Sequence, residues 1–136
     1  MDNMCQTGRP VFLIVDDDDI MRALLRSWMI INFPFSHIVE AKNGREALYM
    51  AQSRTPDVIL MDIWMPVMDG FEATLRIKIC EPDIKIMVIT SDENGQCRDR
   101  ALSAGADGYF LKREMATDLI PALREILYFE AGTGTA

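Results

Sequence analysis

The sequence predicts an α/β fold built on a doubly wound parallel sheet of five strands, and two observations carry this prediction. Short apolar runs alternate five times with longer amphipathic stretches along the 136 residues. The runs do not alternate with polar residues, which is typical of strands that helices cover on both faces. With 49% hydrophobic and 26% charged residues, the chain has enough apolar side chains for one buried core.

Each strand is expected at one apolar run. The runs are 11–15 (VFLIV), 38–41, 58–61 (VILM), 84–89 (IKIMVI) and 108–111 (GYFL). Right-handed crossovers leave few topologies for such a (βα)5 chain, and five strands fit the flavodoxin-like order 2-1-3-4-5.

Apolar residues at helical spacing predict helices between the strands. The expected helices are 20–33, a second from Asn43 to before Pro56, 71–79, 94–104 and 117–129. Asn43 is followed three residues later by Glu46, a capping-box pattern. Gly105 is expected just past the end of its helix, and Pro121 lies near the start of the last one, where a missing N–H costs little.

One domain is expected over 11–129, between a disordered N-terminal segment 1–10 and a C-terminal tail 130–136. No apolar run approaches the ~20 residues of a membrane helix, and the N-terminus has no apolar signal region. We therefore expect a cytoplasmic protein without a membrane partner. The net charge of −7 argues against direct binding of nucleic acid. Cys5, Cys80 and Cys97 lack metal-binding spacing and are expected as free thiols.

Polar side chains stand where the predicted strands end. Asp16 and Asp17 follow the first strand, Asp62 the third, Thr90 the fourth and Lys112 the fifth. Parallel strands place these ends at one edge, with the ligand crevice beside the first and third strands. Each residue alone has an ordinary explanation as a cap, a turn former or a surface side chain. Their joint occurrence at one edge favours a functional site.

The chemistry of this set is specific. Three close carboxylates repel one another unless a cation neutralises them, and an oxygen-only set without His or Cys suits Mg²⁺. A carboxylate beside Mg²⁺ can act as a nucleophile toward phosphorus and form an aspartyl-phosphate. An ammonium and a hydroxyl would then bind the remaining phosphoryl oxygens.

These residues lie in segments that resemble the receiver domain of two-component response regulators. FLIVDDDDIMR is similar to the family's acidic first-strand motif, and EAKNGREAL to its second strand and helix. PDVILMDIWMPVMDG is similar to the phosphoacceptor motif, and MVITS and GADGYFLK to the last two motifs. The resemblance extends over residues 11 to 128 and implies a chemotaxis-regulator-like fold.

The resemblance also implies roles for single residues. Asp62 corresponds to the phosphorylated aspartate. The implied Mg²⁺ ligands are Asp16, Asp17, Asp62 and the backbone carbonyl of Trp64. Lys112 is implied to contact the phosphoryl group, Thr90 to be the switch hydroxyl, and Tyr109 the aromatic switch residue.

The implied function is that of a phosphoacceptor signalling domain rather than an enzyme, with intrinsic self-phosphorylation and self-dephosphorylation. The implied donor is a sensor histidine kinase, a phosphotransfer protein or a small phosphodonor. Phosphorylation is implied to switch the face formed by the fourth helix, fifth strand and fifth helix. An output domain or protein partner would read that face, and a homodimer formed on phosphorylation is one such outcome.

One residue departs from the family pattern, and the sequence leaves open whether an output domain follows the receiver. Arg113 follows Lys112 where the family usually has proline, which leaves the geometry of that peptide bond open. The segment GYFLKRE is most similar to regulators that carry a C-terminal helix-turn-helix, so the chain is either a stand-alone receiver or part of a longer regulator.

Trp64 and Asp92 are expected at the entrance of the site. The Trp64 indole is predicted to cover part of the phosphoryl group and restrict the hydrolytic water. Asp92, two residues after Thr90, faces the same entrance. The alternative for Trp64 is an aromatic residue of a loop, packed on the next helix.

Three other functions would each use part of this sequence. A haloacid-dehalogenase-type phosphatase would use Asp16 and Asp18 as a DxD pair, but Ile20 replaces the expected Thr or Val and little chain remains for a lid. A degenerate receiver would bind partners without phosphorylation, although the site residues are complete. A flavodoxin-like carrier would need a Gly- and hydroxyl-rich phosphate loop where this sequence has four aspartates.

Overall fold

The computed structural model describes residues 9–132 and contains a five-stranded parallel sheet of order β2-β1-β3-β4-β5. The strands are β1 (Val11–Val15), β2 (His37–Ala41), β3 (Val58–Met61), β4 (Lys85–Thr90) and β5 (Gly108–Leu111). The predicted topology is confirmed, with β2 starting one residue earlier than expected and β4 displaced by one residue. The expectations for 1–8 and 133–136 lie outside the described residues.

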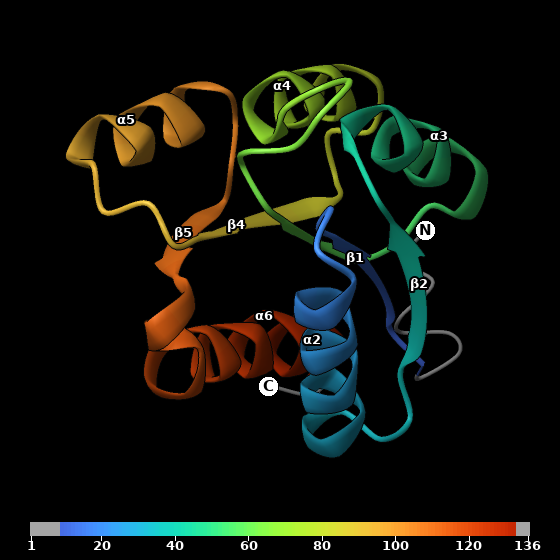
Figure 1. Cartoon of the computed structure of the whole chain (residues 1–136). Helices are drawn as coiled ribbons and strands as arrows, with labels where there is room; N and C mark the ends of the chain where they lie inside the picture. Colours follow the sequence, from blue (N-terminus) through green and yellow to red (C-terminus); the bar gives the residue numbers. More distant parts are fainter. Residues whose placement is uncertain (1–8, 133–136) are drawn as a thin grey trace.

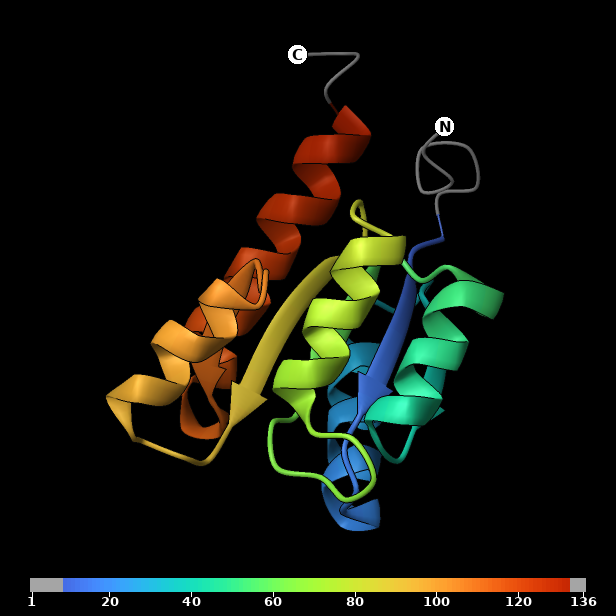
Figure 2. The same cartoon turned by 90° about the horizontal axis from the view of Figure 1, so that it is seen from above.

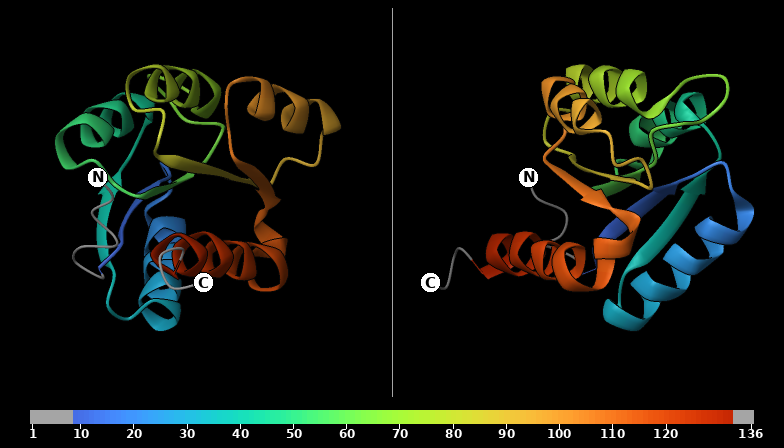
Figure 3. Two further views of the ribbon diagram at one scale, coloured as in Figure 1. Left: turned by 180° about the vertical axis from the view of Figure 1, so that it is seen from behind. Right: turned by 60° about the vertical axis from the view of Figure 1, so that its left-hand side comes forward.

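Helices cover both faces of this sheet. They are α2 (Asp19–Asn32), α3 (Gly44–Arg54), α4 (Gly70–Cys80), α5 (Gly95–Ser103) and α6 (Ile120–Gly132). Helices α3, α4 and α5 lie side by side on one face (Figures 1 and 2). Helices α2 and α6 lie on the other face (Figure 3). Over the described residues, no helix is both long and apolar enough to cross a bilayer.

The two helical layers explain why the central strands β1 and β3 are apolar throughout. In β1, Leu13 and Val15 belong to the core beneath α3, α4 and α5. Phe12 and Ile14 belong to the core on the α2 and α6 side. All four side chains are almost completely buried. A polar residue in the middle of β1 would therefore be buried on either face, and the first polar groups of this chain segment come after the strand, at Asp16 and Asp17.

Most helix ends follow the sequence signals. The Asn43 side chain caps α3 by accepting a hydrogen bond from the Glu46 N–H at 2.9 Å. The Glu46 carboxylate in turn accepts a hydrogen bond from the Lys42 N–H, one residue before the cap, rather than from the N–H of Asn43 itself. Gly105 follows α5 with a φ of +108°, the left-handed conformation for which glycine was expected there.

The chain after β5 differs from the single helix predicted over 117–129. A 3₁₀ turn (Lys112–Glu114) and a π-helical turn (Met115–Leu119) precede α6, which extends to Gly132. Pro121 has no N–H to donate, and the Ile120 N–H bonds the Met115 carbonyl five residues back, as in a π-helical turn. No cis peptide bond occurs in residues 9–132, so the Lys112-Arg113 bond is trans.

The side chain of Thr74, in α4, is buried, and its hydroxyl has no hydrogen-bond partner. A buried hydroxyl without a partner is destabilising because it loses its bond to water and gains none. We expect Thr74→Val to raise the free energy of unfolding in urea by about 1 kcal/mol.

Thr74→Ser is the matched control, because it keeps the hydroxyl and removes only the methyl group. It should lower the free energy of unfolding through lost packing. A valine variant that is less stable than the wild type would show that the hydroxyl does make a bond.

Candidate functional site

Three carboxylates meet at the carboxyl edge of β1 and β3. Asp16 and Asp17 directly follow β1, and Asp62 directly follows β3. One oxygen atom from each lies within 4.8 Å of the others. Asp16 and Asp62 are buried, whereas Asp17 is exposed. The convergence expected from the strand ends is therefore present in the structure.

Lys112, the residue after β5, brings a cation to this cluster. Its Nζ lies 3.2 Å from Asp16 Oδ2 and 3.8 Å from Asp62 Oδ1. Burial and the charge of Asp16 raise the pKa of Asp62 to about 6, and Lys112 offsets only part of this. One ammonium among three carboxylates leaves net negative charge, and all the acidic donors are oxygens. A hard divalent cation such as Mg²⁺ fits this donor set.

The loop between β3 and α4 is fixed by backbone contacts. The Gly70 N–H donates to the Ile63 carbonyl at 2.7 Å, and the Gly44 N–H donates to the Met68 carbonyl at 2.9 Å. A Cβ on Gly70 would lie 2.1 Å from the Asp62 carbonyl oxygen. Only glycine at this position lets α4 begin directly against the backbone of Asp62.

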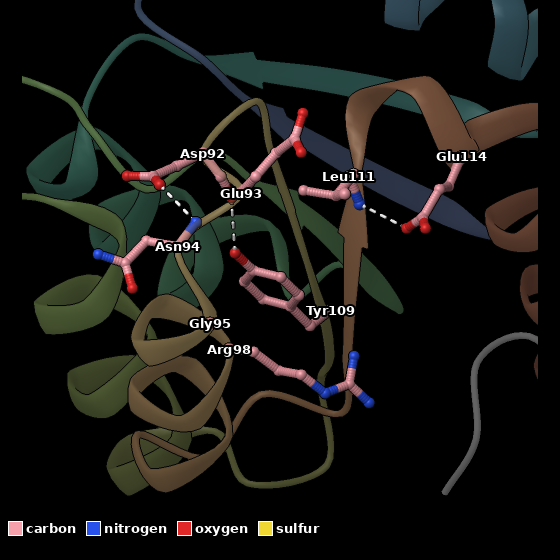
Figure 4. A pocket seen from close by; sticks show the side chains of 8 residues that line it. All are labelled: Asp92, Glu93, Asn94, Gly95, Arg98, Tyr109, Leu111 and Glu114. Carbon is pink, nitrogen blue, oxygen red and sulfur yellow. Dashed lines mark hydrogen bonds between the residues drawn. The ribbon is translucent and has the colours of Figure 1, made fainter.

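Thr90 and Tyr109 are connected through Asp92. Thr90 is buried at the end of β4, and its Oγ1 accepts a hydrogen bond from the Asp92 N–H at 3.0 Å. The half-buried Tyr109 donates its hydroxyl to the Asp92 carbonyl at 3.2 Å (Figure 4). Both predicted switch residues thus bond the backbone of one residue, a link that the sequence motifs did not indicate.

Asp92 also connects the loops that follow β3 and β4. The Trp64 indole Nε1 donates to Asp92 Oδ2 at 2.8 Å, joining the loop after β3 to the loop after β4. Hydrogen bonds from the Asn94 N–H and then from Trp64 lower the pKa of Asp92. The Trp64 ring also meets Phe71 of α4 edge-on, with centroids 5.6 Å apart. The packing alternative for Trp64 is therefore present together with its hydrogen bond to Asp92.

A cavity of about 200 Å³ opens between the start of α5 and β5 (Figure 4). Its lining residues are Asp92, Glu93, Asn94, Gly95, Arg98, Tyr109, Leu111 and Glu114. The Arg98 guanidinium lies 6.0 Å from the centroid of the Tyr109 ring. This cavity belongs to the face predicted to switch, formed here by α5, β5 and α6, and contains none of the clustered carboxylates.

Arg113 takes a defined position despite its departure from the family pattern. Its Nη1 forms an ion pair with Oε2 of Glu93, so the chain after β5 is tied to the loop after β4. Both side chains are mostly exposed, and such a pair adds little stability. Cys80 and Cys97 are free thiols as expected, and Cys5 lies outside the described residues.

Comparison with known proteins agrees with this geometry. The family model described as the response regulator receiver domain matches residues 12–124. The chain belongs to this family. It is therefore a receiver domain of the two-component systems, a signalling domain, and the resemblance seen in the motifs is confirmed.

The relatives differ in how much of their length the chain spans. It is 39% identical over 115 residues to the chemotaxis protein CheY of Halobacterium salinarum, covering 85% of this chain and 94% of that protein. It is 37% identical to a putative transcriptional regulator of Pseudomonas aeruginosa, covering 90% of this chain but 59% of the relative. For the response regulator VraR of Staphylococcus aureus the identity is 39%, covering 83% of this chain and 54% of the relative.

Solved structures show the same fold. A CheY-like receiver domain from Methanospirillum hungatei superposes with a TM-score of 0.79 at 27% identity, covering 93% of this chain and 98% of that one. A two-component response regulator of the LuxR family from Aurantimonas gives a TM-score of 0.79 at 31% identity, covering 88% and 85%.

The raised pKa of Asp62 makes a prediction for the metal-free protein. The folded state holds the Asp62 proton up to a pKa of about 6, against 3.8 for the ordinary group, so stability falls as pH rises through this interval. An asparagine side chain cannot ionise, so we expect Asp62→Asn to be more stable than wild type by about 3 kcal/mol at pH 7.5 in EDTA.

The gain should shrink at pH 5, where the folded wild type already holds the proton. Urea unfolding at both pH values measures the difference. An equal gain at the two values would contradict an origin in the Asp62 charge.

Proposed function

We propose that Asp62 accepts a phosphoryl group in a Mg²⁺-dependent reaction. The donor is a phosphohistidine of a sensor kinase or phosphotransfer protein, or a small phosphodonor. The observation that carries the proposal is the placement of the Asp62 carboxylate beside two further carboxylates and one ammonium. In the reaction an Asp62 oxygen bonds to phosphorus while the P–N bond of the phosphohistidine breaks, and the leaving imidazole takes up a proton.

Each neighbour has a part in this chemistry. Asp16, Asp17, Asp62 and the Trp64 carbonyl are the proposed Mg²⁺ ligands. The bound ion would neutralise charge on the phosphoryl oxygens. Lys112, now paired with Asp16, would turn its ammonium to another phosphoryl oxygen.

Signalling would follow from Thr90 and Tyr109. If the Thr90 hydroxyl moves to the phosphoryl group, its bond to the Asp92 N–H is lost. Tyr109 bonds the carbonyl of the same Asp92, so the rearrangement would reach the α5–β5–α6 face. An output domain or a protein partner would read this face, by homodimerisation or by direct binding, in the cytoplasm.

The structure gives the phosphatase alternative no support. Asp18 would be the second acid of its DxD pair, but the Asp18 carboxylate caps α2 instead. It accepts hydrogen bonds from the Ile20 N–H at 2.9 Å and the Met21 N–H at 3.3 Å. The degenerate receiver is disfavoured because Asp62 and Lys112 stand together at the carboxylate cluster.

Acetyl phosphate tests the proposed chemistry. With Mg²⁺ present, intact mass spectrometry should show one added phosphoryl group on the wild type and none on Asp62→Asn. Asp18→Asn is the matched control, because asparagine can still cap α2 and the change removes one charge from the same acidic run. Labelling of Asp62→Asn at the wild-type level, or labelling that EDTA does not reduce, would refute the proposal.

The Trp64–Asp92 hydrogen bond predicts a shielding effect on the phosphorylated state. We expect Trp64→Asn to lose its phosphoryl group faster than wild type, because the indole no longer restricts water at the entrance. The rate is measured by following the phosphorylated mass after the donor is removed.

The same variant should lose most of the fluorescence change that Mg²⁺ or beryllofluoride causes. Trp28→Phe, which removes the half-buried tryptophan of α2, should keep that change. An unchanged phosphoryl lifetime in Trp64→Asn would leave Trp64 with a packing role only.

A further inference from the structure

Arg22, in the first part of α2, joins three segments of the chain. Its Nε donates to Glu40 Oε1 of β2 at 3.0 Å, and its Nη2 donates to Asp19 Oδ1 at 2.7 Å. Its Nη1 donates to the backbone carbonyl of Asp16 at 2.9 Å. The Arg22 side chain is only 13% exposed, and its bonds to Glu40 and to the Asp16 carbonyl are partly buried, whereas the Asp19 carboxylate is exposed.

The bonded carbonyl lies between two of the proposed metal ligands. It belongs to the peptide group that joins Asp16 to Asp17, and this group is planar. A hydrogen bond to the carbonyl therefore restrains the orientation of the whole peptide group. This in turn restrains the direction of the Cα–Cβ bond of Asp17. Arg22 thus acts on the chain at the point where β1 turns into the acidic run.

Asp17 depends on this restraint more than Asp16 does. The Asp16 carboxylate is held separately, because it accepts from the Asp18 N–H at 2.9 Å and pairs with Lys112. Within residues 9–132, the Asp17 carboxylate has no hydrogen-bond or ion-pair partner. The position of its carboxylate near Asp16 and Asp62 therefore follows from its backbone.

Arg26, one turn further along α2, provides an internal comparison. It donates from Nη1 to the other oxygen of the same glutamate, Glu40 Oε2, at 3.1 Å. Its side chain is 45% exposed, and among residues 9–132 its side-chain hydrogen bond is to Glu40 alone. The two arginines therefore share a helix, a charge and a partner, and differ in the contact with the acidic run.

We infer that Arg22 is a positioning residue for divalent cation binding, which sets the Asp16-Asp17 backbone so that the Asp17 carboxylate faces the cluster. This inference rests on the proposed Mg²⁺ site. A lysine would not replace Arg22, because a single ammonium cannot reproduce the planar fork that serves three acceptors in different directions.

Replacing Arg22 removes both a positive charge and a positioning contact, and the two losses have opposite effects on the affinity for Mg²⁺. Removing a nearby positive charge should by itself strengthen the binding of a cation to the carboxylates. Loss of a residue that orients a metal ligand weakens binding, commonly by about tenfold or more. Whether the dissociation constant for Mg²⁺ rises or falls therefore shows whether Arg22 acts as a positioning residue or only as a nearby charge.

The experiment measures the dissociation constant of Mg²⁺ by calorimetry on the 136-residue chain, first stripped of metal with EDTA. We expect Arg22→Met and Arg22→Lys each to weaken Mg²⁺ binding about tenfold or more. Arg26→Met, which removes the same charge and one bond to Glu40, should leave the dissociation constant unchanged. NMR of the metal-free proteins should show the Asp17 amide resonance displaced in the Arg22 variants and not in Arg26→Met.

Urea unfolding shows whether each variant is folded under the titration conditions. If Arg22→Met is unfolded, Arg22→Lys is used to test the inference. Unchanged or tighter Mg²⁺ binding by a folded Arg22 variant would overturn the inference while the proposed function stands. Absence of Mg²⁺ binding by the wild type would instead overturn the proposed function, and the inference with it.

Discussion

The crowding of negative charge at one edge of the sheet is the constraint around which the structure is organised. Asp16, Asp17 and Asp62 lie close together with a single ammonium, that of Lys112, inside the cluster. Repulsion among them is tolerated because the apolar cores on both faces of the sheet hold the strand ends in place. Neutralising this charge releases electrostatic energy, which favours the binding of a cation at this edge of the sheet.

The sequence predicts the fold and the carboxylate cluster for the same physical reason. A strand buried on both faces has an apolar sequence up to its end, so the first polar residue marks the edge of the sheet. Asp62 and Lys112 are placed by this rule alone, although their side chains come from strands 50 residues apart in the sequence. The register of parallel strands then brings the two together.

Contacts that depend on loop paths and rotamers were not predictable in this way. The bond between the Trp64 indole and Asp92 requires two loops to approach each other, and no local pattern encodes that approach. The bond from Arg22 to the Asp16 carbonyl joins a side chain to a backbone atom and leaves no signature in composition. Pro121 did carry a usable signal, since a residue without an N–H indicates irregular hydrogen bonding where the last helix begins.

The edge position of β5 has a consequence for motion. This strand pairs only with β4, and all four of its residues are partly accessible, whereas β3 is buried throughout. Amide protons at such an edge are expected to exchange with solvent through local openings that cost less than global unfolding. An accessible edge strand therefore carries Tyr109 and leads into Lys112, while the buried strands β1 and β3 lead into the carboxylates. In the proposed switch, a rearrangement beside the buried strands would therefore reach the surface through a strand that opens more readily than its neighbours.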